Sequence, residues 1–109
     1  GLDVPDHSTG CLQDVHWSMG AIGYFPTYTL GNLYCAQFFE TASEQVPGMV
    51  AGFERGEFEP LLQWLRSNIH CHGRRYGAAE LCQKITGKSL SAKPLMNYLE
   101  NKLRPLHGA

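Results

Sequence analysis

The chain has 109 residues and a formal net charge of −1, the balance of nine lysines and arginines against ten aspartates and glutamates. This length allows one domain at most, and a charge so close to zero argues against nucleic acid or an anionic membrane surface as a partner. Apolar runs are much shorter than the roughly 20 residues that cross a bilayer, so we expect a soluble protein.

The N-terminal stretch and the cysteines indicate whether the chain is part of a longer polypeptide and in which compartment it is found. It begins at Gly1, not at a methionine, and residues 1–10 are polar and typical of a loop, which suggests a piece of a longer polypeptide. The cysteines have neither the paired spacing of a zinc ribbon nor the density of a secreted disulfide scaffold. Free thiols in the cytoplasm are therefore expected for Cys11, Cys35, Cys71 and Cys82.

The pattern of apolar residues predicts an all-α segment. Apolar side chains recur every three or four positions, and no stretch alternates as a half-buried strand would. We expect about five helices in one segment, residues 1–109. In chain order, the first runs from about Cys11 to Gly20 and the second from about Leu30 to Val46, where Pro47-Gly48 stops it. A short helical turn follows near Met49–Arg55.

The C-terminal half predicts three further amphipathic helices. The spans are about Glu57–Cys71, about Ala78–Thr86, and a last helix that starts after Ser91 as N-cap and tolerates Pro94 in its first turn. Each is expected to bury one apolar stripe. The stripes are Phe58, Leu61, Leu62, Leu65 and Ile69, then Leu81, Cys82 and Ile85, then Leu95, Leu99 and Leu103.

Aromatic residues crowd the N-terminal half, where seven of the twelve fall between positions 17 and 39. The predicted helix at 30–46 is therefore apolar nearly all round. A helix of that kind is buried on most sides, which three short partners cannot achieve. We expect a larger body to cover it.

The candidate chemistry lies in the same region. On a helix over residues 11–20, Gln13, His16 and Trp17 fall on one face. Pro26 disfavours helix at the residue before it and removes an amide donor, so residues 24–28 are expected to form an irregular bend that presents Tyr24 and Tyr28 to a cavity.

A histidine and one or two tyrosines across such a bend can converge on one oxygen and stabilise a developing oxyanion. The alternative is that His16 is a satisfied core histidine and the tyrosines are packing residues. Periodicity and spacing leave both interpretations open.

The sequence of residues 10–17 resembles a known family signature. Gly10-x-x-Gln13-Asp14-x-His16-Trp17 resembles the G-x-x-Q-D-x-H-W signature of the zinc metallocarboxypeptidases of the carboxypeptidase Taq family, at every fixed position. The stretch from Gly23 to Asn32 and the sequence Ile85-Thr86-Gly87 also look like the C-terminal region of that family, so the resemblance covers essentially the whole chain.

The resemblance implies a C-terminal helical lobe of a larger, mostly helical metallopeptidase, usually a homodimer. Such enzymes remove single residues from peptides with a free C-terminus. By this similarity, His16 and a phenol, Tyr24 in preference to Tyr28, donate to the substrate carbonyl or the tetrahedral intermediate. Gln13 and Asp14 position the helix and its histidine, and Trp17 packs beneath them.

The family's metal site is missing from these residues. The H-E-x-x-H motif, the motif with the third ligand, and the motif whose arginine engages the substrate carboxylate are all absent. The resemblance implies that zinc or cobalt is held by a missing N-terminal part of the same enzyme. No metal ligand is assigned here, and the isolated piece is expected to be inactive.

Other clusters support weaker hypotheses. Consecutive ligands at His70-Cys71-His72 diverge on a helix, so a metal site there is disfavoured, and the basic residues at 74–88 are better explained as solvated helix ends. A second functional class remains open, namely an autonomous small helical protein-interaction module. It predicts a closed core with His16 buried, whereas the lobe interpretation predicts a broad exposed apolar face.

Overall fold

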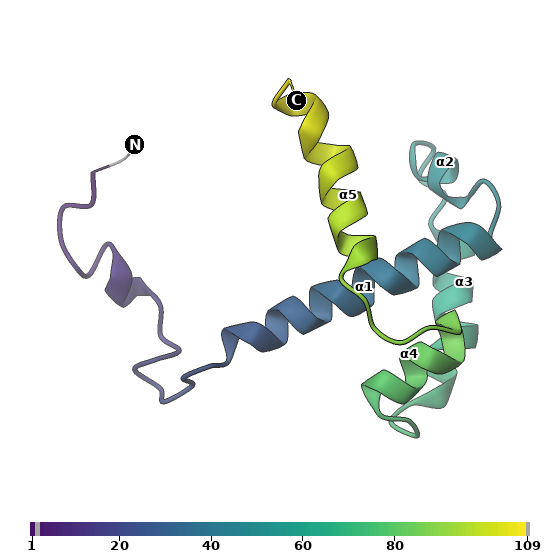
Figure 1. Ribbon diagram of the computed structural model, residues 1–109, viewed down its shortest axis with the longest axis horizontal. Coiled ribbons are helices and arrows are strands. Elements are labelled where there is room, and N and C mark those ends of the chain that lie inside the picture. The colour runs from purple at the N-terminus through teal and green to yellow at the C-terminus, as the bar shows by residue number, and fades with distance from the viewer. Residues whose placement is uncertain (2, 109) are drawn as a thin grey trace.

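The computed structural model describes residue 1 and residues 3–108, so Leu2 and Ala109 of the predicted segment lie outside the described residues. Within them every regular element is helical, which confirms the all-α class (Figure 1). The α-helices are α1 (Phe25–Gln45), α2 (Met49–Phe53), α3 (Glu59–Asn68), α4 (Ala78–Thr86) and α5 (Lys93–Leu103). Single 3-10 turns occur at Cys11–Gln13, His70–His72 and Arg104–Leu106.

The longest helix, α1, organises the molecule. The other α-helices gather around its C-terminal half, while the N-terminal arm extends away from its other end (Figure 1). The small buried core lies at the gathered end, where Ala42, Met49 and Trp64 are at most 6% exposed. By contrast, every residue from 22 to 32 is exposed, so the first turns of α1 project with no cover from the described residues.

A buried glutamine joins α1 to the connection between α4 and α5. Gln37 is 3% exposed, and its amide donates to Thr86 Oγ1 and to the Ser89 carbonyl, both at 3.1 Å. Its Oε1 accepts from the Ser91 amide at 2.9 Å. Each polar atom of this side chain is thus satisfied, as burial requires.

Helix boundaries in the C-terminal half agree well with the sequence. The predicted bounds of α4 are confirmed, and Gly87 ends it in the left-handed region at φ 71°, a conformation that suits glycine. The Ser91 hydroxyl accepts from the Lys93 amide at 3.2 Å, at the start of α5. In the third helix, however, Phe58 is 59% exposed and the core residue is Trp64, which the stripe did not include.

The predictions for the N-terminal region were partly wrong. No α-helix forms over residues 11–20, where one 3-10 turn is followed by hydrogen-bonded turns. The segment from Tyr24 to Tyr28 is not an irregular bend, because α1 begins at Phe25 instead of Leu30. Pro26 lies in the first turn of α1, where a helix needs no amide donor, so it starts the helix.

The molecule is far from compact. Its radius of gyration is 18.3 Å, against about 13 Å for a compact domain of this length. Its accessible surface is 8437 Å², against about 6,000 Å² for a folded monomer of this mass. None of the described helices is both long enough and apolar enough to cross a membrane.

Candidate functional site

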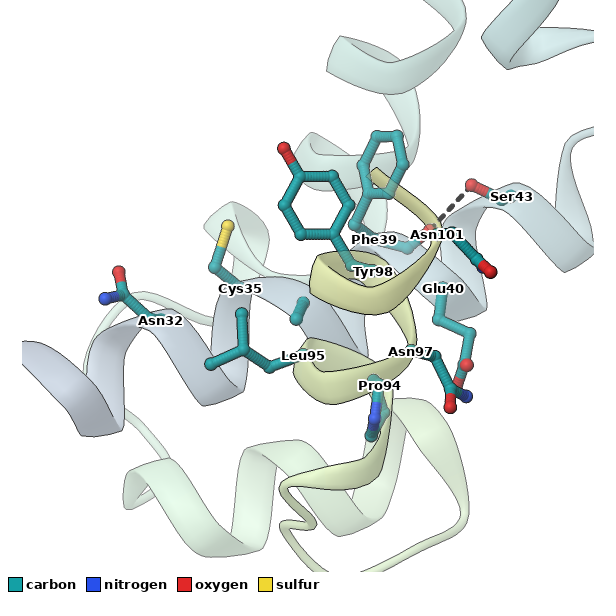
Figure 2. Close-up of a pocket in the computed structure, with 11 residues that line it drawn as sticks. Asn32, Cys35, Phe39, Glu40, Ser43, Pro94, Leu95, Asn97, Tyr98 and Asn101 are labelled. Atoms are coloured by element: carbon teal, nitrogen blue, oxygen red, sulfur yellow. Dashed lines mark hydrogen bonds between the residues drawn. The ribbon is translucent and has the colours of Figure 1, made fainter. Parts of the chain in front are cut away.

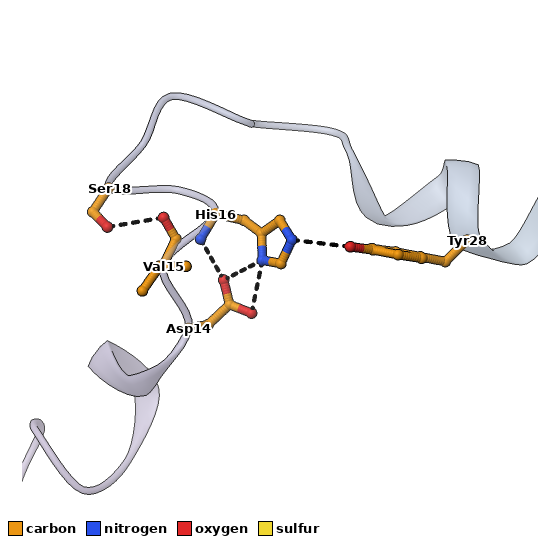
Figure 3. A network of polar contacts seen from close by, with 5 residues as sticks. All are labelled: Asp14, Val15, His16, Ser18 and Tyr28. Atoms are coloured by element: carbon orange, nitrogen blue, oxygen red, sulfur yellow. Dashed lines mark hydrogen bonds and ion pairs between the residues drawn. The ribbon is translucent and has the colours of Figure 1, made fainter.

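A side-chain turn at Asp14 replaces the predicted helix. Asp14 is extended, with ψ 123°, and its Oδ1 accepts from the backbone amide of His16 at 2.8 Å. Aspartate competes with helical hydrogen bonding in this way, by offering the backbone a local acceptor. The turn directs the His16 ring toward α1 (Figure 3).

His16 joins Asp14 and Tyr28 in one hydrogen-bonded chain (Figure 3). Its Nδ1 lies 3.1 Å from Asp14 Oδ1 and 3.3 Å from Oδ2, and its Nε2 lies 3.2 Å from the Tyr28 hydroxyl. Because a carboxylate only accepts, Nδ1 carries the hydrogen. In the neutral ring Nε2 then accepts from Tyr28, and in the imidazolium it donates.

Aromatic rings surround the imidazole. The ring centroid of Phe25 lies 4.9 Å from that of His16, Tyr24 stacks at 5.6 Å, and Tyr28 meets it edge-on at 6.1 Å. Sequence reasoning missed Phe25, although it stands between the two chosen tyrosines. All three rings are 44–50% exposed, so the cluster forms an open wall with no cover among the described residues.

The remaining predicted residues lie around this wall without joining its hydrogen bonds. Gln13 closes the 3-10 turn through its backbone amide, which donates to the Gly10 carbonyl at 3.1 Å. Trp17 is 69% exposed, and the expectation that it packs beneath Gln13 and Asp14 stays a prediction. It lies in the reversal after His16, where the Ala21 amide donates to the His16 carbonyl at 2.8 Å.

A separate groove of about 730 Å³ runs between α1 and α5 (Figure 2). It is lined by Asn32, Cys35, Ala36, Phe39, Glu40 and Ser43 of α1, and by Pro94, Leu95, Asn97, Tyr98 and Asn101 of α5. Most of this lining is apolar. His16 and its partners are not part of it, so the groove and the wall are distinct features.

Metal-binding side chains do not converge in the part of the chain that the structure describes. Nowhere in residues 1 and 3–108 do three His, Cys, Asp or Glu side chains gather in a position to share an ion. The described residues therefore do not fit a metal centre. What they offer instead is a hydrogen-bonding wall of one carboxylate, one imidazole and phenols.

Comparison with known proteins adds a family match. The model of the carboxypeptidase Taq (M32) metallopeptidase family matches residues 1–103. Thermostable carboxypeptidase 1 of Thermus thermophilus is 47% identical over 99% of this chain, and carboxypeptidase 1 of Bacillus subtilis is 41% identical over 98% of it. Each of these alignments covers 21% of the relative, so the chain spans about a fifth of their length.

Solved structures give the same result. The crystal structure of an M32 carboxypeptidase from Deinococcus radiodurans R1 aligns with a TM-score of 0.86 at 44% identity. That alignment covers 100% of this chain and 22% of the other. The open surface and the protruding arm thus belong to a chain that corresponds to one part of much longer proteins.

Proposed function

This chain belongs to the carboxypeptidase Taq (M32) metallopeptidase family, and we propose that it is the C-terminal part of a metal-dependent carboxypeptidase that removes single residues from peptide C-termini. Its contribution is one wall of the active site. The observation that carries the proposal is the hydrogen-bonded chain from Asp14 through His16 to Tyr28. It brings Asp14 and His16 of the first motif together with Tyr28, which lies 12 positions after His16 in the sequence.

The wall is suited to stabilising negative charge. When a peptide bond is hydrolysed, its carbonyl oxygen becomes negatively charged in the tetrahedral intermediate, and donors aimed at that oxygen lower the barrier. Protonated His16 donates through Nε2, while Asp14 accepts from Nδ1 and favours one direction of the ring. Tyr28 no longer donates to Nε2 in that state, so once the substrate oxygen replaces Tyr28 as the acceptor for the Nε2 hydrogen, the Tyr28 O–H is free to donate to the same oxygen.

The choice between the two phenols follows from their contacts. Tyr28 places its hydroxyl 3.2 Å from His16 Nε2, whereas Tyr24 meets the imidazole with its ring face. We therefore assign the donor role to Tyr28 first and keep Tyr24 as the second candidate. Gln13 and Trp17 remain proposed substrate-binding or positioning residues.

Other groups of the site come from outside this chain. We propose that zinc or cobalt is bound by the remaining part of the same polypeptide, together with the substrate's terminal carboxylate. When bound, such an ion polarises the peptide carbonyl and activates water. The roles proposed for this chain are hydrogen bonding and orientation, and the chain alone is proposed to be inactive.

The setting of the enzyme is also proposed. We infer a cytoplasmic enzyme from the four free cysteines, and a homo-oligomer from the family resemblance. An autonomous interaction module would have a closed core and a buried His16. The open surface and the 27% exposure of the His16 side chain support the lobe interpretation instead.

The test is substitution in the full-length, metal-loaded protein, with kcat and KM measured for release of the C-terminal amino acid from a blocked peptide. His16→Ala is expected to lower kcat about 10²- to 10³-fold, the usual effect of losing one oxyanion donor. Tyr28→Phe is expected to lower kcat about 10- to 100-fold, and Tyr24→Phe less than about threefold.

The two tyrosine variants control for each other, because each removes one hydroxyl and keeps the ring. A larger loss in Tyr24→Phe than in Tyr28→Phe would reverse the assignment of the donor. Full activity of His16→Ala would refute the proposed role of the wall.

A further inference from the structure

The hydrogen bonds alone hold the His16 ring loosely. Its contacts with Asp14 and Tyr28 measure 3.1–3.3 Å, longer than the usual 2.9–3.0 Å. The side chain is 27% exposed, so water competes for both nitrogen atoms. A further contact must limit rotation of the imidazole if Nε2 is to point steadily toward Tyr28 and the substrate oxygen.

Phe25 is the ring that lies nearest to His16. Its centroid is 4.9 Å from the imidazole at an interplanar angle of 52°, and it also lies 6.3 Å from the ring of Tyr28. It therefore packs against both partners of the bond at Nε2. Aromatic contacts in this range are directional, so they favour one orientation of the imidazole.

The backbone at Phe25 is well fixed. It is the first residue of α1 and is followed by Pro26, whose ring sets its own φ. The amide and hydroxyl of Thr27 donate to the Tyr24 carbonyl at 3.0 and 2.7 Å, which ties down the residue before Phe25. The phenyl ring is thus carried by the first turn of α1, while His16 lies on the arm.

From this arrangement we propose that Phe25 is a positioning residue, which holds the His16 imidazole in the orientation that aims Nε2 toward Tyr28 and the substrate oxygen. The inference rests on the function proposed above. Phe25 has no polar side-chain atom, so it takes no part in the chemistry and acts only through His16. It follows that removing the phenyl ring should matter only while His16 is present.

A double-mutant cycle in the full-length, metal-loaded enzyme tests this dependence. Phe25→Leu is expected to lower kcat about three- to tenfold with little change in KM, and Phe25→Tyr to retain most of the activity, because the aromatic contact is kept. In the His16→Ala background, Phe25→Leu is expected to have no further effect. An equal loss in both backgrounds would overturn the proposal, since Phe25 would then act through general structure.

Phe39→Leu is the matched control. Phe39 lies on the same helix and is 38% exposed, but its ring partner is Phe53 and not His16. It should leave kcat unchanged. A loss as large as that of Phe25→Leu would overturn the proposal, because any aromatic on α1 would then have the same effect.

A second measurement does not depend on activity. Long-range ¹H–¹⁵N spectra report the tautomer of His16. The signals of this ring are assigned as those that disappear from the spectrum of His16→Ala. At a pH where the imidazole is neutral, the wild type should show hydrogen on Nδ1, because Phe25 keeps the ring where Asp14 can accept from Nδ1. Phe25→Leu should show a mixture of tautomers, and an unchanged spectrum overturns the inference. If His16→Ala is fully active, the proposed function fails, and the spectrum still decides whether Phe25 positions the ring.

Discussion

At the scale of single residues, Asp14 decides the local structure and the state of the histidine. Its carboxylate holds the His16 amide and the Nδ1 hydrogen, so one side chain both breaks the expected helix and sets the tautomer. This double use explains why the residues of the motif lie in a turn and not in the expected helix. A helical wheel has no means of representing a side chain that competes with the backbone.

Asp14→Asn should lower kcat of the full-length enzyme about 10- to 100-fold, because a hydrogen bond to a charged group is worth about 1.5–3 kcal/mol. The measurement is kcat with a blocked peptide. Asp6→Asn is the matched control on the same arm. The Ser8 hydroxyl, with Thr9, holds the pKa of Asp6 below its usual range, and Asp6 does not contact His16. Equal losses in the two variants would contradict the role of Asp14.

Part of the candidate site could be predicted from sequence, because His16, Tyr24 and Tyr28 lie in or beside a distinctive string. Phe25 could not, since no polar chemistry marks it. Its position depends on where α1 begins, and that boundary was placed five residues too late. Pro26 was interpreted as a helix breaker, although a proline in the first turn is equally compatible with a helix start.

At the scale of elements, the glycines and amphipathic stripes of the C-terminal half predicted helix positions well. Such signals are local. The part-buried hydrogen bond from the Trp64 indole to Gln45 Oε1, at 2.7 Å, joins two residues 19 positions apart on different helices and leaves no trace in periodicity. Gln37 is similar, because its partners lie 49 to 54 residues away.

Gln37→Leu should loosen the connection between α4 and α5. It leaves the Ser91 amide and the Ser89 carbonyl without their partner, at a cost of about 1–3 kcal/mol. Hydrogen exchange of the full-length protein, followed by mass spectrometry on a peptide covering residues 87–93, should become about 10- to 100-fold faster. Gln63→Leu, at an exposed position of α3, should leave that peptide unchanged. The same slow exchange in both variants would argue against the bridging role.

At the scale of the whole molecule, the surface is larger than that of a compact protein by about 2,400 Å². This excess is in the range buried by permanent interfaces. Exposed large apolar residues lie on the arm, on α1, on α5 and on the 3-10 turn that follows it, including Trp17, Ile22, Tyr28, Leu30, Met96 and Leu106.

The 109-residue chain by itself should therefore bind an apolar dye strongly and self-associate, because contiguous exposed apolar surface is rare on monomers. Sedimentation velocity with and without dye is the measurement, and the full-length protein is the comparison, expected to bind little dye. A clean monomer without dye signal would indicate that the chain closes on itself in solution.

The shape of α1 has a mechanical consequence. The helix is anchored in the core at Ala42 and carries Tyr28 about 20 Å away, at a rise of 1.5 Å per residue. It acts as a lever arm, so a tilt of about 3° at the anchor displaces the phenol by about 1 Å, enough to cost a well-aligned reaction a factor of about 100. Substitutions that create cavities around Ala42 or Met49 would thus displace the Tyr28 hydroxyl at the far end of the helix.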